Sequence, residues 1–216
     1  MQNPIASVLA RRKSGAGARG VFDGREFELR RVRLTDYASW RTIRLANERR
    51  LAPAFKRQDR TWEECHSPMA WVEWFADTAV GSLRRTRYAL VIVEHAAGKP
   101  ARVVGEVGLC GVDPVTRAGE LSAWVSDSPG TLVPWGLANV IDRVFAPEYG
   151  LERIVAPGVE TKGRPAHLVA ALGMERIGTR RDFRIFNGEP TDHMMCVLEN
   201  TPEVRASMRA LAAGPR

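Results

Sequence analysis

Cysteine and carboxylate side chains are the groups in this chain whose types and spacing could carry chemistry. The three cysteines, Cys65, Cys110 and Cys196, are far apart, with no CxxC pair and no cysteine–histidine spacing. We therefore expect neither a disulfide framework nor a zinc site, and no other bound metal. Glu106 and Glu120 each stand inside a mainly apolar segment that is typical of a strand. Glu120 is either a solvated or salt-bridged glutamate or a functional carboxylate, whereas a charge on the exposed face is the favoured interpretation of Glu106.

The basic residues are concentrated in the first quarter of the chain. Residues 1–60 contain 15 Arg or Lys and six Asp or Glu, whereas residues 61–216 contain 17 and 19, and the net charge is +7. We expect residues 1–22 to be a flexible basic arm outside the fold. Contact with nucleic acid is not expected, because no recognition motif or interleaved aromatic residues follow the arm.

Length and composition exclude several classes of protein. With 216 residues and 44% apolar side chains, the chain can bury the core of one large domain or two small ones. No apolar run reaches the roughly 18–20 residues of a membrane-spanning helix, so no membrane association is expected. The apolar start has no preceding basic region and no small-residue cleavage site, which argues against a secretory signal. A cytoplasmic protein with reduced thiols is the expectation.

The hydrophobic pattern alternates between strand and helix periodicity. Thr61 and Glu64 form a capping-box sequence, and Pro68 is expected to divide the following aromatic stretch into two helical pieces. A strand–helix–strand unit at 119–156, within a mostly antiparallel set, predicts a mixed sheet with helices on both faces. Strands are expected at 27–34, 88–94, 103–110, 119–126, 151–156, 174–185 and 192–199, and helices at 37–51, 131–145 and 164–172.

Six segments, taken in order, resemble the GCN5-related N-acetyltransferase (GNAT) superfamily. The resemblance is to its branch of ribosomal-protein alanine N-acetyltransferases (RimJ/RimL-like), and it runs from about Phe27 to Glu199. It implies an α+β fold with a mixed, mostly antiparallel seven-stranded sheet, a GNAT domain at 23–200 and a C-terminal tail at 201–216. The segments are LRRVRLTDYASWRTIR (29–44), VVGEVGL (103–109), AGELSAWVS (118–126), GLERIVA (150–156), LVAALGM (168–174) and FNGEPTDHMM (186–195).

The resemblance also implies a reaction, the transfer of an acetyl group from acetyl-CoA as cosubstrate to a protein N-terminal or small-molecule amine. In that role Glu120 matches the carboxylate that serves as base, or holds a water, in several members of the superfamily. The backbone of Trp124, Val125 and Ser126 would pair with the pantetheine amides. A salt-bridged structural glutamate remains the alternative interpretation of Glu120.

The segment expected to bind the pyrophosphate, SPGTLVPWG (128–136), departs from the family pattern of Q/R-x-x-G-x-G/A. Gly130, Thr131 and Gly136 are small residues, which let the backbone approach phosphate. Pro134, in contrast, removes one amide donor. Lys162 replaces the family's Asn and could reach the CoA phosphates as a cation. These departures support a second hypothesis, a catalytically degenerate GNAT-fold protein that no longer binds acetyl-CoA and acts as an interaction or regulatory module.

The acceptor cannot be named from the residues. In this branch, the cleft is usually bordered by segments that correspond to 51–61 and 184–192. The first of these contains Lys56, Arg57 and Arg60, which would favour an acidic acceptor or partner, although a solvated basic loop is the simpler interpretation. Many relatives form homodimers, and the sequence leaves the oligomeric state open.

Overall fold

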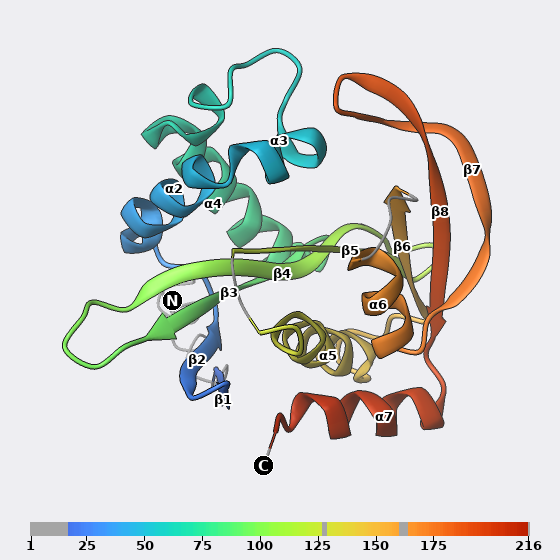
Figure 1. The fold of residues 1–216 in the computed structure, drawn as a ribbon. Helices are drawn as coiled ribbons and strands as arrows, with labels where there is room; N and C mark the ends of the chain where they lie inside the picture. The colour runs from blue at the N-terminus through green and yellow to red at the C-terminus, as the bar shows by residue number, and fades with distance from the viewer. Residues whose placement is uncertain (1–16, 127–128, 160–163, 216) are drawn as a thin grey trace, which may run out of the picture.

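A computed structural model describes residues 17–126, 129–159 and 164–215 of the chain. The elements are β1 (Ala18–Phe22), β2 (Arg25–Arg30), the 3₁₀ turn η2 (Leu34–Asp36), α2 (Tyr37–Ala46), α3 (Glu48–Phe55), the 3₁₀ turn η3 (Glu64–His66), α4 (Pro68–Arg84), β3 (Tyr88–His95), β4 (Arg102–Asp113), β5 (Ala118–Val125), α5 (Leu132–Phe145), β6 (Arg153–Val159), α6 (Arg164–Ala171), β7 (Glu175–Phe186), β8 (Glu189–Glu199) and α7 (Pro202–Ala212). Helices α2, α3 and α4 cover one face of the sheet, and α5, α6 and α7 lie on the other (Figure 1).

The sheet has the expected mixed, mostly antiparallel character, but it has eight strands instead of seven. Its order is β1-β2-β3-β4-β5-β6-β8-β7, and among the described strands only β5 and β6 pair in parallel. The additional strand β1 pairs with β2 through a turn in which Asp23 and Gly24 have φ values of 50° and 73°. Residues 18–22, which the sequence placed in the basic arm, therefore form an edge strand. The Asp23-Gly24 dipeptide was the signal for this hairpin.

Both faces of the central strands are buried, which explains the continuous apolar run of β3. Leu90 and Ile92 point into the larger core, which is completed by α5 and α7. Val91 and Val93 point to the opposite side, into a second core under α2 and α4 that contains several tryptophans. Alternate side chains of a strand point to opposite faces of its sheet, so a strand between two helical layers is apolar throughout.

The C-terminal residues expected to form a helix-prone tail are the helix α7, which packs along α5 (Figure 1). Met208 of α7 is buried in the larger core. The indole of Trp135 donates to the carbonyl of Ala212 at 3.0 Å, and Asn139 Nδ2 donates to the same carbonyl at 3.3 Å. Within the described residues, no helix has the length and apolar character needed to cross a membrane.

The local signals of the α2–α4 region are confirmed, with one difference. Glu64 N–H donates to Thr61 Oγ1 at 3.2 Å and Thr61 N–H donates to Glu64 Oε2 at 2.7 Å, which is the capping box. Pro68 is the first residue of α4, where its missing N–H costs nothing. The single helix expected at 37–51 is divided at Asn47, whose side chain donates back to the carbonyl of Ile43.

Replacing Gly105 with Ala should destabilise the protein by about 1–3 kcal/mol, because a methyl group there overpacks the sheet. A Cβ at Gly105 would lie 2.7 Å from the carbonyl oxygen of Trp124 and 3.0 Å from a methyl of Val125. Chemical denaturation of both proteins measures this difference. Gly130→Ala is the control, since a Cβ at Gly130 meets no atom within 4 Å, and an equal loss in both variants would contradict the prediction.

Candidate active site

The parallel strands β5 and β6 separate part of the way along their length. They pair from Ala118 and Arg153 to Glu120 and Val155, and the pairing ends there. Beyond Glu120, β5 stays paired with β4 on its other edge, while β6 continues alongside β8. One edge of β5 from residue 121 onward therefore faces an opening in the sheet, where backbone N–H and C=O groups can meet a ligand.

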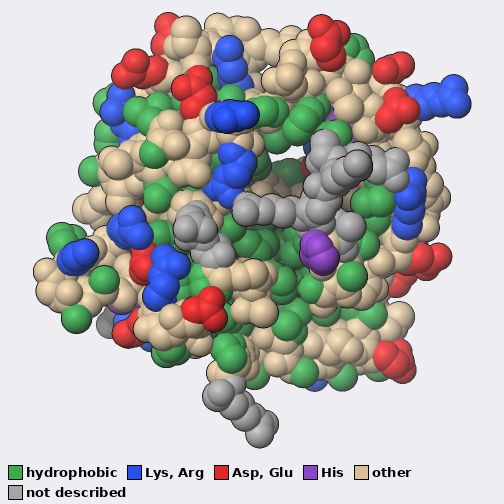
Figure 2. Space-filling view, viewed as in Figure 1, with side chains coloured by type: hydrophobic (Ala, Val, Ile, Leu, Met, Phe, Trp, Pro, Cys, Tyr) green, Lys and Arg blue, Asp and Glu red, His purple; other side chains and the backbone are tan. Residues whose placement is uncertain are grey.

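The opening is enclosed on the side of α3 by the hairpin of β7 and β8. The hairpin tip reaches α3, and Asn187 N–H donates to the carbonyl of Pro53 at 3.0 Å. Asn187 and Gly188 have φ values of 54° and 88°, which fits the tight turn expected from the Asn-Gly pair. The structure thus brings segments 51–61 and 184–192 together. Figure 2 shows a hollow near the middle of this face, with apolar side chains inside it and Arg or Lys side chains at its rim.

Glu120 lies at the closed end of the opening and is held in an ion pair. Arg184 Nη1 and Nη2 lie 2.6 Å from Glu120 Oε1 and Oε2, and this contact raises the pKa of the Arg184 guanidinium. The Cys110 thiol lies 3.9 Å from the same carboxylate, and burial raises the pKa of this thiol. The ion-paired alternative for Glu120 is therefore the geometry observed, and its role as base stays a prediction.

Glu106 lies on β4 opposite Trp124 of β5. The Trp124 indole donates to Glu106 Oε2 at 3.1 Å. Burial raises the pKa of Glu106, and the opposing influences are that hydrogen bond and the charges of Arg44 and Arg87. Trp124 belongs to the core under α2 and α4. Glu120 is an even number of positions before Trp124 on the same strand, so its side chain projects to the same face of the sheet. Two carboxylates therefore line one side of the opening, and sequence reasoning had favoured an exposed charge for Glu106.

Beneath these carboxylates, α2 buries an arginine among aromatic rings. The guanidinium carbon of Arg44 lies 5.0–5.5 Å from the ring centres of four aromatic side chains, and the residue is 7% exposed. Burial lowers the pKa of Arg44 to about 10, so it remains charged at neutral pH. The four rings belong to Trp40, Phe55, Trp62 and Trp124. A charged side chain on an amphipathic helix is expected on its outer face, whereas Arg44 is buried.

His66 is fully buried beside Arg44 and has a defined tautomer. Arg44 Nε–H donates to His66 Nε2 at 2.9 Å, so this nitrogen is unprotonated. His66 Nδ1 then carries the proton and donates to the carbonyl of Trp62 at 2.5 Å. Burial, reinforced by the neighbouring arginine charges and opposed by the bond to Trp62, lowers the pKa of His66 to about 4. The imidazole is therefore neutral in the folded protein at neutral pH.

The residues expected to hold the cofactor differ from one another in their hydrogen-bond partners and exposure. Ser126 N–H donates to the carbonyl of Val104 on the β4 side of the strand, and the Val125 carbonyl accepts from Arg50, so these two groups already have partners. Gly130 and Thr131 are exposed before the first turn of α5. Gly136 instead lies in the second turn, where a Cβ would be 3.3 Å from Val107. The absence of a side chain at Gly136 allows close packing of helix on sheet, and its expected role in approaching phosphate stays a prediction.

Two further observations limit the donors available at the start of α5. The N–H of Leu132 donates to the carbonyl of Pro129 at 3.1 Å, and Pro134 has no N–H. Lys162 lies outside the described residues. The described part of the chain holds no group of three or more His, Cys, Asp or Glu side chains that could bind a metal.

The basic residues expected to attract an acidic acceptor are largely balanced by nearby carboxylates. Arg57 pairs with Asp59 at 2.9 Å, and Arg60 lies 3.6 Å from Glu73. Lys56 is exposed. The pairing supports the alternative of a solvated loop.

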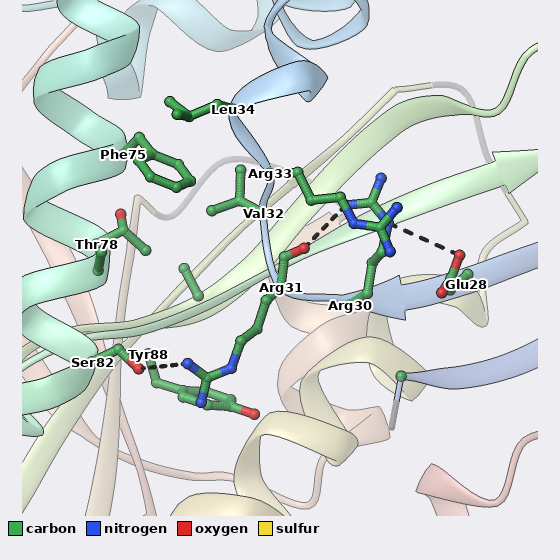
Figure 3. A pocket seen from close by; sticks show the side chains of 13 residues that line it. Glu28, Arg30, Arg31, Val32, Arg33, Leu34, Phe75, Thr78, Ser82 and Tyr88 are labelled. Carbon is green, nitrogen blue, oxygen red and sulfur yellow. Dashed lines mark hydrogen bonds and ion pairs between the residues drawn. The ribbon is translucent and has the colours of Figure 1, made fainter. Parts of the chain in front are cut away.

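A separate groove of about 480 Å³ lies where β2 leaves the sheet, bordered by α4 and the start of β3 (Figure 3). Arg31 reaches across it, with its Nη1 3.4 Å from Ser82 Oγ, and lies near the Tyr88 ring. Arg30 is held by Asp36 through two bonds of 2.8 Å. The β5–β6 opening is elsewhere on the sheet, so this groove adds no group to the candidate active site.

Comparisons with known proteins agree with this geometry. The family model described as "Acetyltransferase (GNAT) domain" matches residues 29–195. The chain belongs to the GNAT family. The match spans the GNAT strands that separate, the helices above them and the closing hairpin. A search of curated proteins found no significant match.

Solved structures share the GNAT fold at low sequence identity. RimJ of Mycobacterium smegmatis, in complex with CoA-disulfide, has a TM-score of 0.75 and 21% identity over 90% of this chain and 93% of that chain. The ribosomal-protein-S5-alanine acetyltransferase of Vibrio fischeri has a TM-score of 0.72 and 18% identity over 86% and 98%. RimL, a ribosomal L7/L12 α-N-protein acetyltransferase in complex with coenzyme A, has a TM-score of 0.68 and 12% identity over 80% and 93%. These likenesses establish the fold alone.

Proposed function

We propose that this GNAT domain transfers the acetyl group of acetyl-CoA to an amine, with a protein N-terminus as the acceptor. The observation that carries the proposal is the separation of β5 from β6 after Glu120. It leaves one strand edge able to hydrogen-bond the amides of pantetheine inside the sheet. The structural neighbours whose names identify them as ribosomal-protein acetyltransferases support a protein N-terminal amine as the acceptor.

The residues present fit one part of the cosubstrate better than the other. The edge of β5 offers backbone groups, and exposed Gly130 leaves space at the start of α5. The phosphate end has fewer amides, because Pro134 has none. We therefore expect acetyl-CoA to be held mainly through its pantetheine arm and by side-chain cations. A cytoplasmic location, where acetyl-CoA and reduced thiols coexist, belongs to the same proposal.

A thermal shift measurement tests cosubstrate binding directly. Acetyl-CoA at about 100 times its Kd should add about 2.7 kcal/mol to the free energy of unfolding, because it binds only the folded state. Desulfo-CoA should give a similar shift, and ATP, which lacks the pantetheine arm, a smaller one. No shift with millimolar acetyl-CoA would overturn the proposal.

Acetyl transfer to defined amines then tests the acceptor class. Release of free thiol should be faster with peptides that begin with Ala or Ser than with the same peptides blocked at the N-terminus, or with spermidine. If spermidine is acetylated faster than the peptides, the proposed protein acceptor is wrong and the acceptor is a polyamine.

A degenerate GNAT protein is the second candidate, and Pro134 together with the occupied N–H of Leu132 favours it. This second hypothesis predicts that the folded protein shows neither acetyl-CoA binding nor thiol release.

A further inference from the structure

We infer that Glu106, and not Glu120, is the carboxylate that accepts the proton from the acceptor amine. This inference rests on the proposed acetyltransferase function. It concerns a residue that the resemblance to the superfamily did not assign to catalysis. Three features of the structure carry it: the face on which Glu106 lies, the partners of each carboxylate, and the environment of the Glu106 side chain.

The face of the sheet is the first feature. Leu121, Ala123 and Val125 of β5 pack against the core formed with α5, whereas Trp124 packs against the core under α2 and α4. A cosubstrate whose phosphates lie near the start of α5 therefore leaves the α2–α4 face for the acceptor. Glu106 meets the Trp124 side chain on that face.

The positions of the two carboxylates along the opening also differ. Glu120 is at its closed end, where the β5–β6 pairing stops. Glu106 is beside Trp124, four residues farther along β5, about 13 Å from that end at 3.3 Å per residue. The two carboxylates therefore lie at different points of the opening, and Glu106 is the one removed from the end where β5 and β6 pair.

The partners of the two carboxylates are the second feature. Both oxygens of Glu120 are bound by Arg184 at 2.6 Å. Glu106 accepts one bond, from the Trp124 indole to Oε2. Among the residues that the structure describes, Oε1 of Glu106 has no hydrogen-bond donor. One oxygen of Glu106 is therefore positioned by Trp124 and the other is available to a substrate ammonium group.

The environment of Glu106 is the third feature. The charged groups that face it are Arg44 from α2 and Arg87, which immediately precedes β3, and the uncharged Trp124 indole faces it from β5. Both arginines and the indole stabilise the carboxylate, yet burial outweighs them and raises the pKa of Glu106 above its usual value. A base is most efficient when its pKa is close to the working pH.

The inferred step begins with an ammonium group whose proton passes to Glu106 Oε1. The free amine then forms a bond to the thioester carbonyl carbon, the carbon–sulfur bond breaks, and its electron pair leaves with the CoA sulfur. The nitrogen loses its second proton and the thiolate gains one, so the products are the acetylated amine and CoA thiol. No oxidant, reductant or metal is required.

The test compares Glu106→Gln with the unmodified protein over pH 5.5–9.5, with a peptide that begins with Ala as the acceptor. Glutamine can still accept from the Trp124 indole, so the packing is preserved. We expect kcat/KM to fall at least 100-fold at pH 7, within the usual contribution of a general base. The acidic limb of the pH profile should disappear, and acetyl-CoA binding should change less than threefold. Glu106→Asp should recover part of the rate with a shifted limb.

Two further variants make the result decisive. Glu63→Gln alters an exposed glutamate paired with Arg41 and should leave the rate unchanged. Glu120→Gln should lower the rate less than Glu106→Gln does. The inference is overturned if Glu106→Gln and Glu106→Asp both keep kcat/KM within threefold, or if the acidic limb persists in Glu106→Gln. If the unmodified protein neither binds acetyl-CoA nor acetylates any amine, the proposed function itself fails, and this outcome is distinct from a loss confined to the Glu106 variants.

Discussion

Replacing Arg44 with Ala should lower the free energy of unfolding by about 3–5 kcal/mol, the range seen when large buried side chains are truncated. The change removes a guanidinium packed against four aromatic rings and leaves a cavity between α2 and the sheet. It also removes the donor to His66 Nε2, so a buried acceptor loses its partner. Chemical denaturation followed by tryptophan fluorescence measures the loss.

Arg41 provides a matched control, because it lies on the same helix and is also paired. It bonds to Glu63 at 2.8 Å, but the two side chains are 36% and 76% exposed. Exposed ion pairs contribute about 0–1 kcal/mol, so Arg41→Ala should be nearly neutral. Arg44→Lys should fall between the two, since Lys keeps the charge but not the planar group that contacts the rings. Equal losses for Arg44→Ala and Arg41→Ala would contradict the structural role of Arg44.

The stability of the protein should fall as the pH is lowered from about 6.5 to 4, and His66 should account for much of that fall. The pKa of His66 is about 4 in the folded protein, against 6.5 for an unperturbed histidine. Between these values the unfolded chain binds a proton that the folded protein does not, so acidification favours unfolding. A difference of about 2.5 units corresponds to about 3 kcal/mol at pH 4, and the effect is absent above the unfolded pKa.

The measurement is the free energy of unfolding at several pH values for the unmodified protein and for His66→Gln. Carboxylates also titrate toward pH 4, so the difference between the two slopes isolates the histidine. We expect the variant to be less stable at pH 7.5 but to lose less stability between pH 6.5 and 4.5. Parallel curves would show that His66 does not cause the acid sensitivity.

The periodic segments of the chain made the order of the strands and helices predictable. The run YALVIVE at 88–94 and the Asn187-Gly188 turn specify local structure with little help from the rest of the chain. Strand β1 was missed because basic and small residues precede it, and the Asp23-Gly24 turn signal was not weighed against that composition. Local propensity also could not show that α2 ends at Ala46, just before Asn47.

The site was less predictable than the fold, because its contacts join segments far apart in the sequence. Glu120 and Arg184 are 64 positions apart, and nothing in either segment indicates that they pair. Arg44 shares a helix face with Trp40, but its charge made an exposed position the expectation, and the aromatic rings that bury it come from three other segments as well as from its own helix. Glu106 could not be distinguished from a surface charge until Trp124 was placed beside it.

The hydrogen bond between Asn187 and Pro53 has a consequence for how molecules can enter and leave. Without it, the space beside β5 would be a groove open along one side, on which a folded surface loop could lie. With it, the tip of the β7–β8 hairpin is tied to α3 beside that space. If the acceptor is the protein N-terminus proposed above, this contact favours a free chain end, which is narrower than a lysine carried on the folded surface of a compact domain.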